Sequence, residues 1–413
     1  MLEGFRSLLA DESAAYTWLM ELHEGSLATI AKEREKTNWD SLTPTELLQE
    51  AMQAVDRCVA VLHRWGFETH SMDAGHGMGH IVRDYTMALI LAPSMECSNV
   101  ARFAVVLAGT FHDIGCALQG RYEDGERAVR HAEAGAYLMQ LVFTEAGIDP
   151  LVSELAVLGI VGHTHYPRPM KVVCKDGVER EVKPFVDLHP DGSPVMSIWG
   201  PRWVDRCDLN GPTFIGRHVL TLTNVRKDFD GDGFYAIDPA EHFRPIMRTA
   251  DEIKAAGGAR TMLEHIELYR GSQSNASLYG KFDSPFMQSI RDERASCLSH
   301  IMAAVLTGDA PHDIEATLVR FESFLATNIE PDPDLGRPAA RKIMAAFREL
   351  PEHTKERWAA GFEATMAEYH VYHEQMIELL AGSKISQGPS DEFRILGYSV
   401  LSVLTPHRSW SAR

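Results

Sequence analysis

Apolar residues recur at helical spacing along much of the first half of the chain. Positions three and four apart share one helix face, so this periodicity predicts amphipathic helices that bury their apolar faces together. One segment, Val100–Thr110, is apolar on almost all sides, which indicates a central helix. The predicted helices are Thr45–Phe67, His80–Leu91, Val100–Thr110, Glu126–Phe143 and Leu151–Val161. Short connections between them favour a compact helical bundle.

The periodicity changes in the segment Lys171–Pro184, where two short valine-containing runs flank an Asp-Gly pair. Such a pair between two extended runs is typical of a tight β-hairpin turn. We expect the hairpin to lie outside the bundle and to lead, through the Pro- and Gly-rich segment Leu188–Pro201, to a short helix with Asp205 and Asp208.

The second half of the chain begins after a polar, glycine-containing segment, Asn224–Pro239. From about Ser284 long amphipathic helices return and continue to near Gly382. The predicted fold class is mainly α, with a small β-hairpin insertion and an additional helical C-terminal region. We expect residues 1–48 to be an N-terminal helical extension, 49–225 the main domain, and 226–413 a helical region that packs on or caps it.

Composition narrows the classes of protein. The 413 residues are 45% hydrophobic and 24% charged, as in ordinary globular proteins. The net charge of −18 opposes binding to nucleic acid polymers and anionic membranes, although bound cations would admit a small phosphorylated substrate. No apolar run reaches the length of a membrane span, and the first residues do not resemble an export signal. These features, with six scattered cysteines, predict a cytoplasmic location.

Two metal-binding side chains, His112 and Asp113, directly follow the central apolar helix. An ionised carboxylate among apolar residues is costly unless a cation or hydrogen-bond donors compensate its charge. The pair therefore predicts one half of a metal site, and the rest of the chain should supply further ligands.

Further histidines and carboxylates stand near the ends of predicted helices, so they could converge at one end of the bundle. The candidates are His80, His131, His163, His165, Asp205 and Asp208. Any one of the 19 histidines is weak evidence alone, but the ordered series His, His-Asp, His, His, Asp indicates a shared site. Imidazole and carboxylate ligands suit Mn, Fe, Co, Ni or Zn, and the carboxylates also admit Mg.

This series resembles that of the HD-domain superfamily of metal-dependent phosphohydrolases over roughly residues 50–215. The resemblance implies that the main domain is a helical HD domain with metal-binding and catalytic roles. It also implies a primary metal site made of His80, His112, Asp113 and Asp205.

A second metal is implied by similarity to the binuclear subgroups of that superfamily. His131 with Gly135 is similar to the His-x-x-x-Gly opening of HD-GYP proteins, and either His163 or His165 would take the remaining position. The chain lacks the Gly-Tyr-Pro tripeptide of that subgroup. It also has Cys116 at the position where a lysine often follows the sequence His-Asp-Ile-Gly.

The resemblance implies two divalent metals about 4 Å apart, bridged by Asp113, which would activate water and stabilise charge on a phosphoryl group. Arg83, one turn beyond His80, could contact a phosphate oxygen or could be a surface charge. Asp84 and Asp208 could orient ligand histidines or the leaving group through hydrogen bonds.

Three functions fit these residues. The first is a phosphohydrolase that cleaves a nucleotide or another small phosphoester. The second is a di-iron oxygenase resembling myo-inositol oxygenase, whose ligand order is the same. The third is a catalytically silent regulatory HD module. The long C-terminal helices are also compatible with a homodimer.

Two other motifs carry less weight. Asp228–Gly233 resembles the start of an EF-hand loop, but Pro239 stands where that loop has a glutamate, so an acidic turn is favoured. The pair His370 and His373 has no partner motif and is interpreted as a solvated or interface face.

Overall fold

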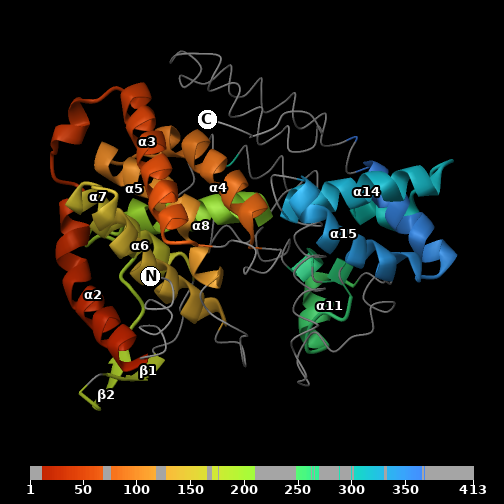
Figure 1. Cartoon of the computed structure of the whole chain (residues 1–413). Helices are drawn as coiled ribbons and strands as arrows, with labels where there is room; N and C mark the ends of the chain where they lie inside the picture. Colours follow the sequence, from red (N-terminus) through yellow and green to blue (C-terminus); the bar gives the residue numbers. More distant parts are fainter. Residues whose placement is uncertain are drawn as a thin grey trace. The chain divides into compact units, whose positions relative to one another are not determined.

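The computed structural model describes most of residues 12–209 and parts of the chain up to residue 367 (Figure 1). The described ranges are 12–67, 76–117, 127–164, 170–174, 176–209, 248–261, 263–264, 266–268, 302–329 and 333–364, with the single residues 288, 299 and 367. These residues form the predicted mainly α fold. The chain divides into two compact units, Met1–Met72 with Asp84–Asp205 and Asp73–Arg83 with Arg206–Arg413.

Five helices lie where the apolar periodicity predicts them, to within a few residues at each end. They are α3 (Pro44–Arg64), α4 (Met78–Leu91), α5 (Asn99–Phe111), α6 (Arg127–Glu145) and α7 (Pro150–Gly162). A 3₁₀ turn, η3 (Ala92–Ser94), follows α4, and another, η4 (Ile114–Ala117), follows α5.

The central helix of the first unit is α5, which packs against α3 and α7. All of its residues except Arg102 are buried. The hydroxyl of Ser98 accepts a hydrogen bond from the backbone N–H of Ala101 at 3.3 Å and so caps the first turn. Burial of this helix brings His112 and Asp113, the next two residues, into the core.

Capping residues fix the starts of α3 and α7, and both helices have a proline at the first position. Thr43 and Glu46 form a reciprocal capping box at α3, in which the Glu46 carboxylate accepts from the Thr43 N–H at 2.8 Å. At α7 the Asp149 carboxylate accepts from the N–H groups of Leu151 and Val152, at 2.9 and 3.2 Å.

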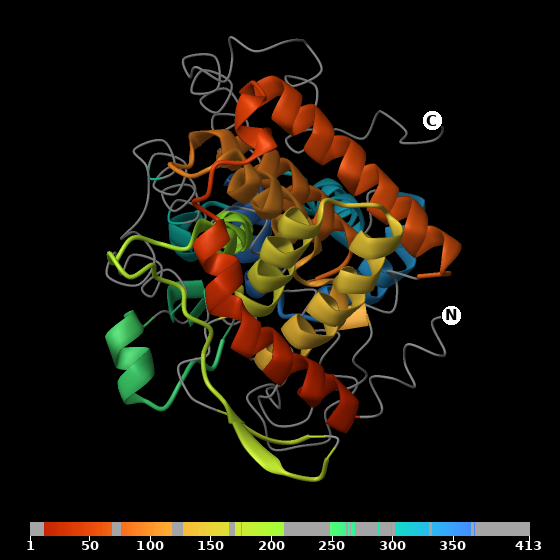
Figure 2. The same ribbon diagram turned by 90° about the vertical axis from the view of Figure 1, so that its left-hand side faces the viewer.

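The N-terminal helix α2 (Glu12–Lys32) packs across α6 and α7 (Figure 2). The residue after it, Glu33, is buried, and its carboxylate accepts hydrogen bonds from the N–H groups of Met196 and Ser197, at 2.8 and 3.3 Å. The Ser197 hydroxyl donates to the same carboxylate at 2.7 Å. Glu33 thus places a negative charge at the first turn of the helix that begins at Met196, where N–H groups without an intrahelical acceptor favour a negative charge.

That helix, α8 (Met196–Leu209), begins earlier than the sequence predicts, because Pro201 lies inside it rather than before it. A proline in a helix lacks the N–H that would bond the carbonyl four residues earlier, here that of Ser197. The Ser197 carbonyl oxygen faces α7 closely, since a Cβ added at Gly159 would lie 2.3 Å from it. The helix therefore tolerates Pro201 at the point where it packs against a glycine of α7.

The segment between α7 and α8 contains two short antiparallel strands, β1 (Met170–Val173) and β2 (Glu179–Val182). Gly177 lies in the turn between them with a φ of 75°, a conformation that favours glycine. Both strands lie beside α2 rather than inside the helical core.

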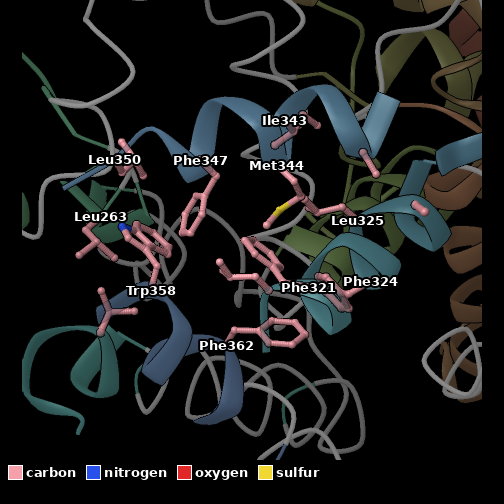
Figure 3. Packing of buried hydrophobic residues seen from close by; sticks show 14 of the residues in the cluster. Leu263, Phe321, Phe324, Leu325, Ile343, Met344, Phe347, Leu350, Trp358 and Phe362 are labelled. Carbon is pink, nitrogen blue, oxygen red and sulfur yellow. The ribbon is translucent and has the colours of Figure 1, made fainter. Parts of the chain in front are cut away.

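The second unit has its own apolar core, built largely by α14 (Ile314–Ile329) and α15 (Pro333–Arg348). In Figure 3, Met344 and Phe347 of α15 point toward Phe321 of α14, and Phe362 lies on the other side of Phe321. The ring of Trp358 lies beside Leu263. The rings of Phe321 and Phe347 meet edge to face, with centroids 5.7 Å apart. A short helix, α11 (Ala250–Ala255), also belongs to this unit.

None of the helices in the described ranges combines the length and hydropathy that a membrane span requires. The EF-hand-like segment Asp228–Gly233 and the pair His370 and His373 lie outside the described residues.

Candidate metal centre

His112 occupies the C-terminal cap of α5 and is 1% exposed. Its Nδ1 lies 2.9 Å from the carbonyl oxygen of Gly109. Because a carbonyl can only accept, Nδ1 carries the proton in this hydrogen bond and Nε2 keeps its lone pair when the ring is neutral. The helix end therefore fixes the ring in the tautomer that binds a metal through Nε2.

His163 repeats this arrangement at the C-terminal cap of α7, where its Nδ1 lies 2.6 Å from the carbonyl oxygen of Ile160. Burial lowers the pKa of His163 to about 4, although a hydrogen bond from the protonated ring to the Asp113 carboxylate opposes this shift. The neutral ring that results is the form in which histidine binds metal ions. Both α5 and α7 are thus followed by a histidine whose Nδ1 bonds the helix backbone and whose Nε2 points away from it.

Asp113 lies between two sets of histidines and turns one oxygen toward each. Its Oδ2 is 3.4 Å from Nε2 of His112, while its Oδ1 is 3.2 Å from Nε2 of His131 and 3.4 Å from Nε2 of His163. The Nε2 atoms of His131 and His163 are themselves 3.1 Å apart. Three side chains, one from α6, one from the residue after α7 and one from the second residue after α5, thereby meet within 3.4 Å of one another.

These side chains make two groups that could each hold a metal ion, with Asp113 in both. The first group is His80, His112, Asp113 and Asp205; the second is Asp113, His131 and His163. Within each group the candidate ligand atoms all lie within 4.8 Å of one another. Imidazole nitrogen and carboxylate oxygen at such spacing fit a first-row transition metal, so the residues suit the cation that the sequence implies.

Close packing of two glycines brings His112 and Asp113 against the helix that carries His131. A Cβ added at Gly115 would lie 1.9 Å from the carbonyl oxygen of His131 and 2.5 Å from the backbone nitrogen of Gly135. Only a residue without a side chain fits at Gly115. A Cβ added at Gly135 would lie 3.1 Å from the backbone nitrogen of Gly115, so this close packing accounts for the glycines at both positions.

Asp205 comes from the third turn of α8, and its side chain is 20% exposed, against 5% for Asp113. Solvent therefore reaches the first group on the side of Asp205. Its Oδ1 lies 3.8 Å from Nε2 of His112.

Arg202, also on α8, joins this helix to the end of α7. Its Nε–H donates to the carbonyl of Gly162 at 2.7 Å, and its Nη1 lies 2.7 Å from the Asp187 carboxylate. The guanidinium also lies over the Trp199 ring, 5.0 Å from its centroid. Because Gly162 directly precedes His163, this contact helps to hold one ligand relative to another.

Three carboxylates surround Nε2 of His112, those of Asp113, Asp84 and Asp205. Burial alone would lower the pKa of His112, but Asp113 above all, with Asp205 and Asp84, outweighs it and raises the pKa well above its usual value. In the absence of a cation, the cluster thus compensates part of its negative charge with a proton on His112.

The structure brings together six of the seven metal ligands named from the sequence. The seventh, His165, lies outside the described residues, and so does the side chain of Asp208. Arg83 is 5% exposed, so the reading of it as a surface charge was wrong.

The sequence predicts that Asp84 orients a ligand histidine or the leaving group, and the structure has its Oδ2 3.6 Å from Nε2 of His112. The signal in the sequence for this position is the spacing of four from His80, which puts both residues on one face of α4.

The fold and the site define a mainly α protein with a buried His/Asp cluster that could bind metal ions at two places. Comparisons of the chain with protein-family models, curated proteins and solved structures found no match.

Proposed function

We propose that the chain is a metal-dependent phosphohydrolase of the HD type that cleaves a nucleotide or another small phosphoester. The observation that supports this proposal most strongly is the position of Asp113, whose two oxygens face two different groups of histidines. A carboxylate shared by two ligand groups is the arrangement that a two-metal hydrolytic site requires.

Each side chain has a role in this proposal. His80, His112 and Asp205 would hold one ion, His131 and His163 the other, and Asp113 would bind both. When bound, two such ions acidify water and stabilise the negative charge that develops on a phosphoryl group. Their identity is proposed only as a class, divalent Mn, Fe, Co, Ni, Mg or Zn.

The remaining site residues would act on the substrate. Arg83, a buried cation three residues after His80 on α4, would bind a phosphate oxygen. His165 stays a predicted alternative to His163 as a metal ligand. Asp208 stays a predicted group that orients the leaving group. The partly exposed side of the site at Asp205 would admit a small substrate.

The test measures phosphate and nucleoside release from a panel of nucleotides and aryl phosphoesters, with each of the candidate metals in turn. We expect turnover by the wild type and by Asp56→Ala, a control on an exposed face of α3, and none by Asp113→Ala. Equal activity in the wild type and Asp113→Ala would contradict the proposal.

Two other results would assign a different function to the same residues. Stoichiometric iron as purified, with substrate-dependent oxygen uptake and no phosphoester turnover, would favour the oxygenase. Intact folding without metal and no turnover with any cation would favour the regulatory module.

A further inference from the structure

Asp84 is a charged group at the candidate metal centre to which the HD resemblance assigns no metal. It lies on α4, four residues after His80, and is 0% exposed. Its Oδ2 is 3.6 Å from Nε2 of His112, the ring nitrogen that would bind a metal because Nδ1 donates to the Gly109 carbonyl.

The three carboxylates around His112 lie at similar distances from Nε2: 3.4 Å for Asp113, 3.6 Å for Asp84 and 3.8 Å for Asp205. A carboxylate this close to the ligand atom of a histidine attracts a cation bound there, and the attraction is stronger in a medium of low dielectric constant. Burial of a charged carboxylate is also less costly when a cation compensates it. Asp84 is therefore placed to favour a divalent cation at Nε2 of His112.

A count of charges shows what Asp84 contributes. The ligand histidines are neutral when they bind metal, so the acidic charge near the two ions comes from Asp84, Asp113 and Asp205. Two divalent ions carry four positive charges, and the three carboxylates offset three of them. Without Asp84 they would offset only two.

We propose that Asp84 is a third acidic member of the metal centre, whose buried charge sets the affinity of the first ligand group for a divalent cation. This inference rests on the metal centre of the proposed function, but not on the reaction catalysed there. Asp84 acts through charge on the ion and through its position beside His112, so it is a positioning residue rather than a catalytic one.

The test is a Co²⁺ titration of the full-length protein after removal of metals with a chelator. Binding is followed by the visible absorption of Co²⁺ and by equilibrium dialysis, neither of which depends on turnover. We expect Asp84→Asn to weaken the binding of one of two Co²⁺ ions about 10- to 100-fold. The second ion, held by Asp113, His131 and His163, should bind with nearly unchanged affinity.

Stabilisation by Co²⁺ separates this role from a structural one. Asparagine has the shape of aspartate but no charge, so Co²⁺ should raise the midpoint of thermal unfolding less in Asp84→Asn than in the wild type, because the variant binds the ion more weakly. A purely structural hydrogen-bonding role predicts a lower midpoint without metal and the same rise with Co²⁺. Asp56→Asn, the same change at an exposed position, should alter neither the midpoint nor the Co²⁺ affinity.

Asp84→Glu gives a second measurement that does not depend on how Asp84→Asn folds. Because it keeps the negative charge, it should retain more Co²⁺ affinity than the asparagine variant. Unchanged Co²⁺ affinity in both variants, or an unchanged rise of the unfolding midpoint with Co²⁺ in Asp84→Asn, would overturn the inference. Failure of the wild type to bind any Co²⁺ would instead overturn the metal centre itself, and the inference with it.

Discussion

The ligand histidines at the ends of α5 and α7 are prepared for metal binding by the backbone of their own helices. In both, Nδ1 is satisfied by the carbonyl three residues earlier, those of Gly109 and Ile160. Helix C-termini have carbonyl groups without intrahelical donors, so a histidine there satisfies one carbonyl and aims Nε2 outward. A His at a helix end can thus present Nε2 to a metal ion without support from distant side chains.

The depressed pKa of His163 makes the metal-free protein less stable in acid. Its folded pKa is about 4, below the ordinary value of 6.5, so between these pH values the unfolded chain binds a proton that the folded chain excludes. The contribution of His163 is complete above pH 6.5 and is lost as pH falls toward 4, by roughly 3 kcal/mol. The raised pKa of His112 acts in the opposite direction, so the effect must be isolated by substitution.

Urea unfolding of metal-free wild type and His163→Gln, from pH 7 to pH 4, isolates the contribution of His163 to the free energy of unfolding. The stability of the wild type relative to His163→Gln should fall across this range. His63→Gln, at an exposed position on α3, serves as the control and should follow the wild type. Parallel profiles for wild type and His163→Gln would show that His163 titrates normally.

At the scale of elements, the approach of η4 to α6 decides whether the two ligand groups share Asp113. Gly115→Ala would push a methyl group into the backbone of His131 and Gly135, which has no flexible end to move aside. We expect a loss of about 2–3 kcal/mol in the free energy of unfolding and weaker metal binding by the second group. Gly25→Ala, in open space on α2, should be neutral or stabilising by up to about 1 kcal/mol. Chemical denaturation of both variants checks this, and equal stability would refute it.

A second element-scale prediction concerns Glu33 and the start of α8. Glu33→Gln would replace one accepting oxygen by a donor that faces the N–H groups of Met196 and Ser197. We expect a loss of about 1–3 kcal/mol in the free energy of unfolding. Glu35→Gln, two residues away and exposed, should stay within about 0.5 kcal/mol of the wild type. If both variants unfold at the same denaturant concentration, Glu33 does not hold α8.

The elements show which features a sequence can predict. The sequence predicts the helices α3 to α7 because apolar spacing and capping residues are local signals. It does not predict the start of α8, because Pro201 suggests a break, while the cap that stabilises the helix comes from Glu33, 163 residues earlier than Met196. The closeness of Asp84 to His112 is not visible in the sequence either, because it depends on the contact of α4 with α5, where Ala88 faces Gly109.

At the scale of the whole molecule, the two compact units have separate apolar cores, and the second ligand group lies entirely in the first unit. Damage to the core of the second unit should therefore leave that group able to bind metal. Phe347 is fully buried among aromatic side chains of the second core, so Phe347→Ala should cost about 3–5 kcal/mol there.

Hydrogen exchange followed by mass spectrometry can assign this loss to one unit. In Phe347→Ala, peptides from α14 and α15 should exchange faster, whereas peptides from α5 and α7 should keep their wild-type protection. Val319→Ala, on the same α14 helix but 59% exposed, is the matched control and should exchange like the wild type. Equal loss of protection in α5 and α14 would mean that the two cores unfold as one cooperative unit, and that metal binding by Asp113, His131 and His163 depends on both.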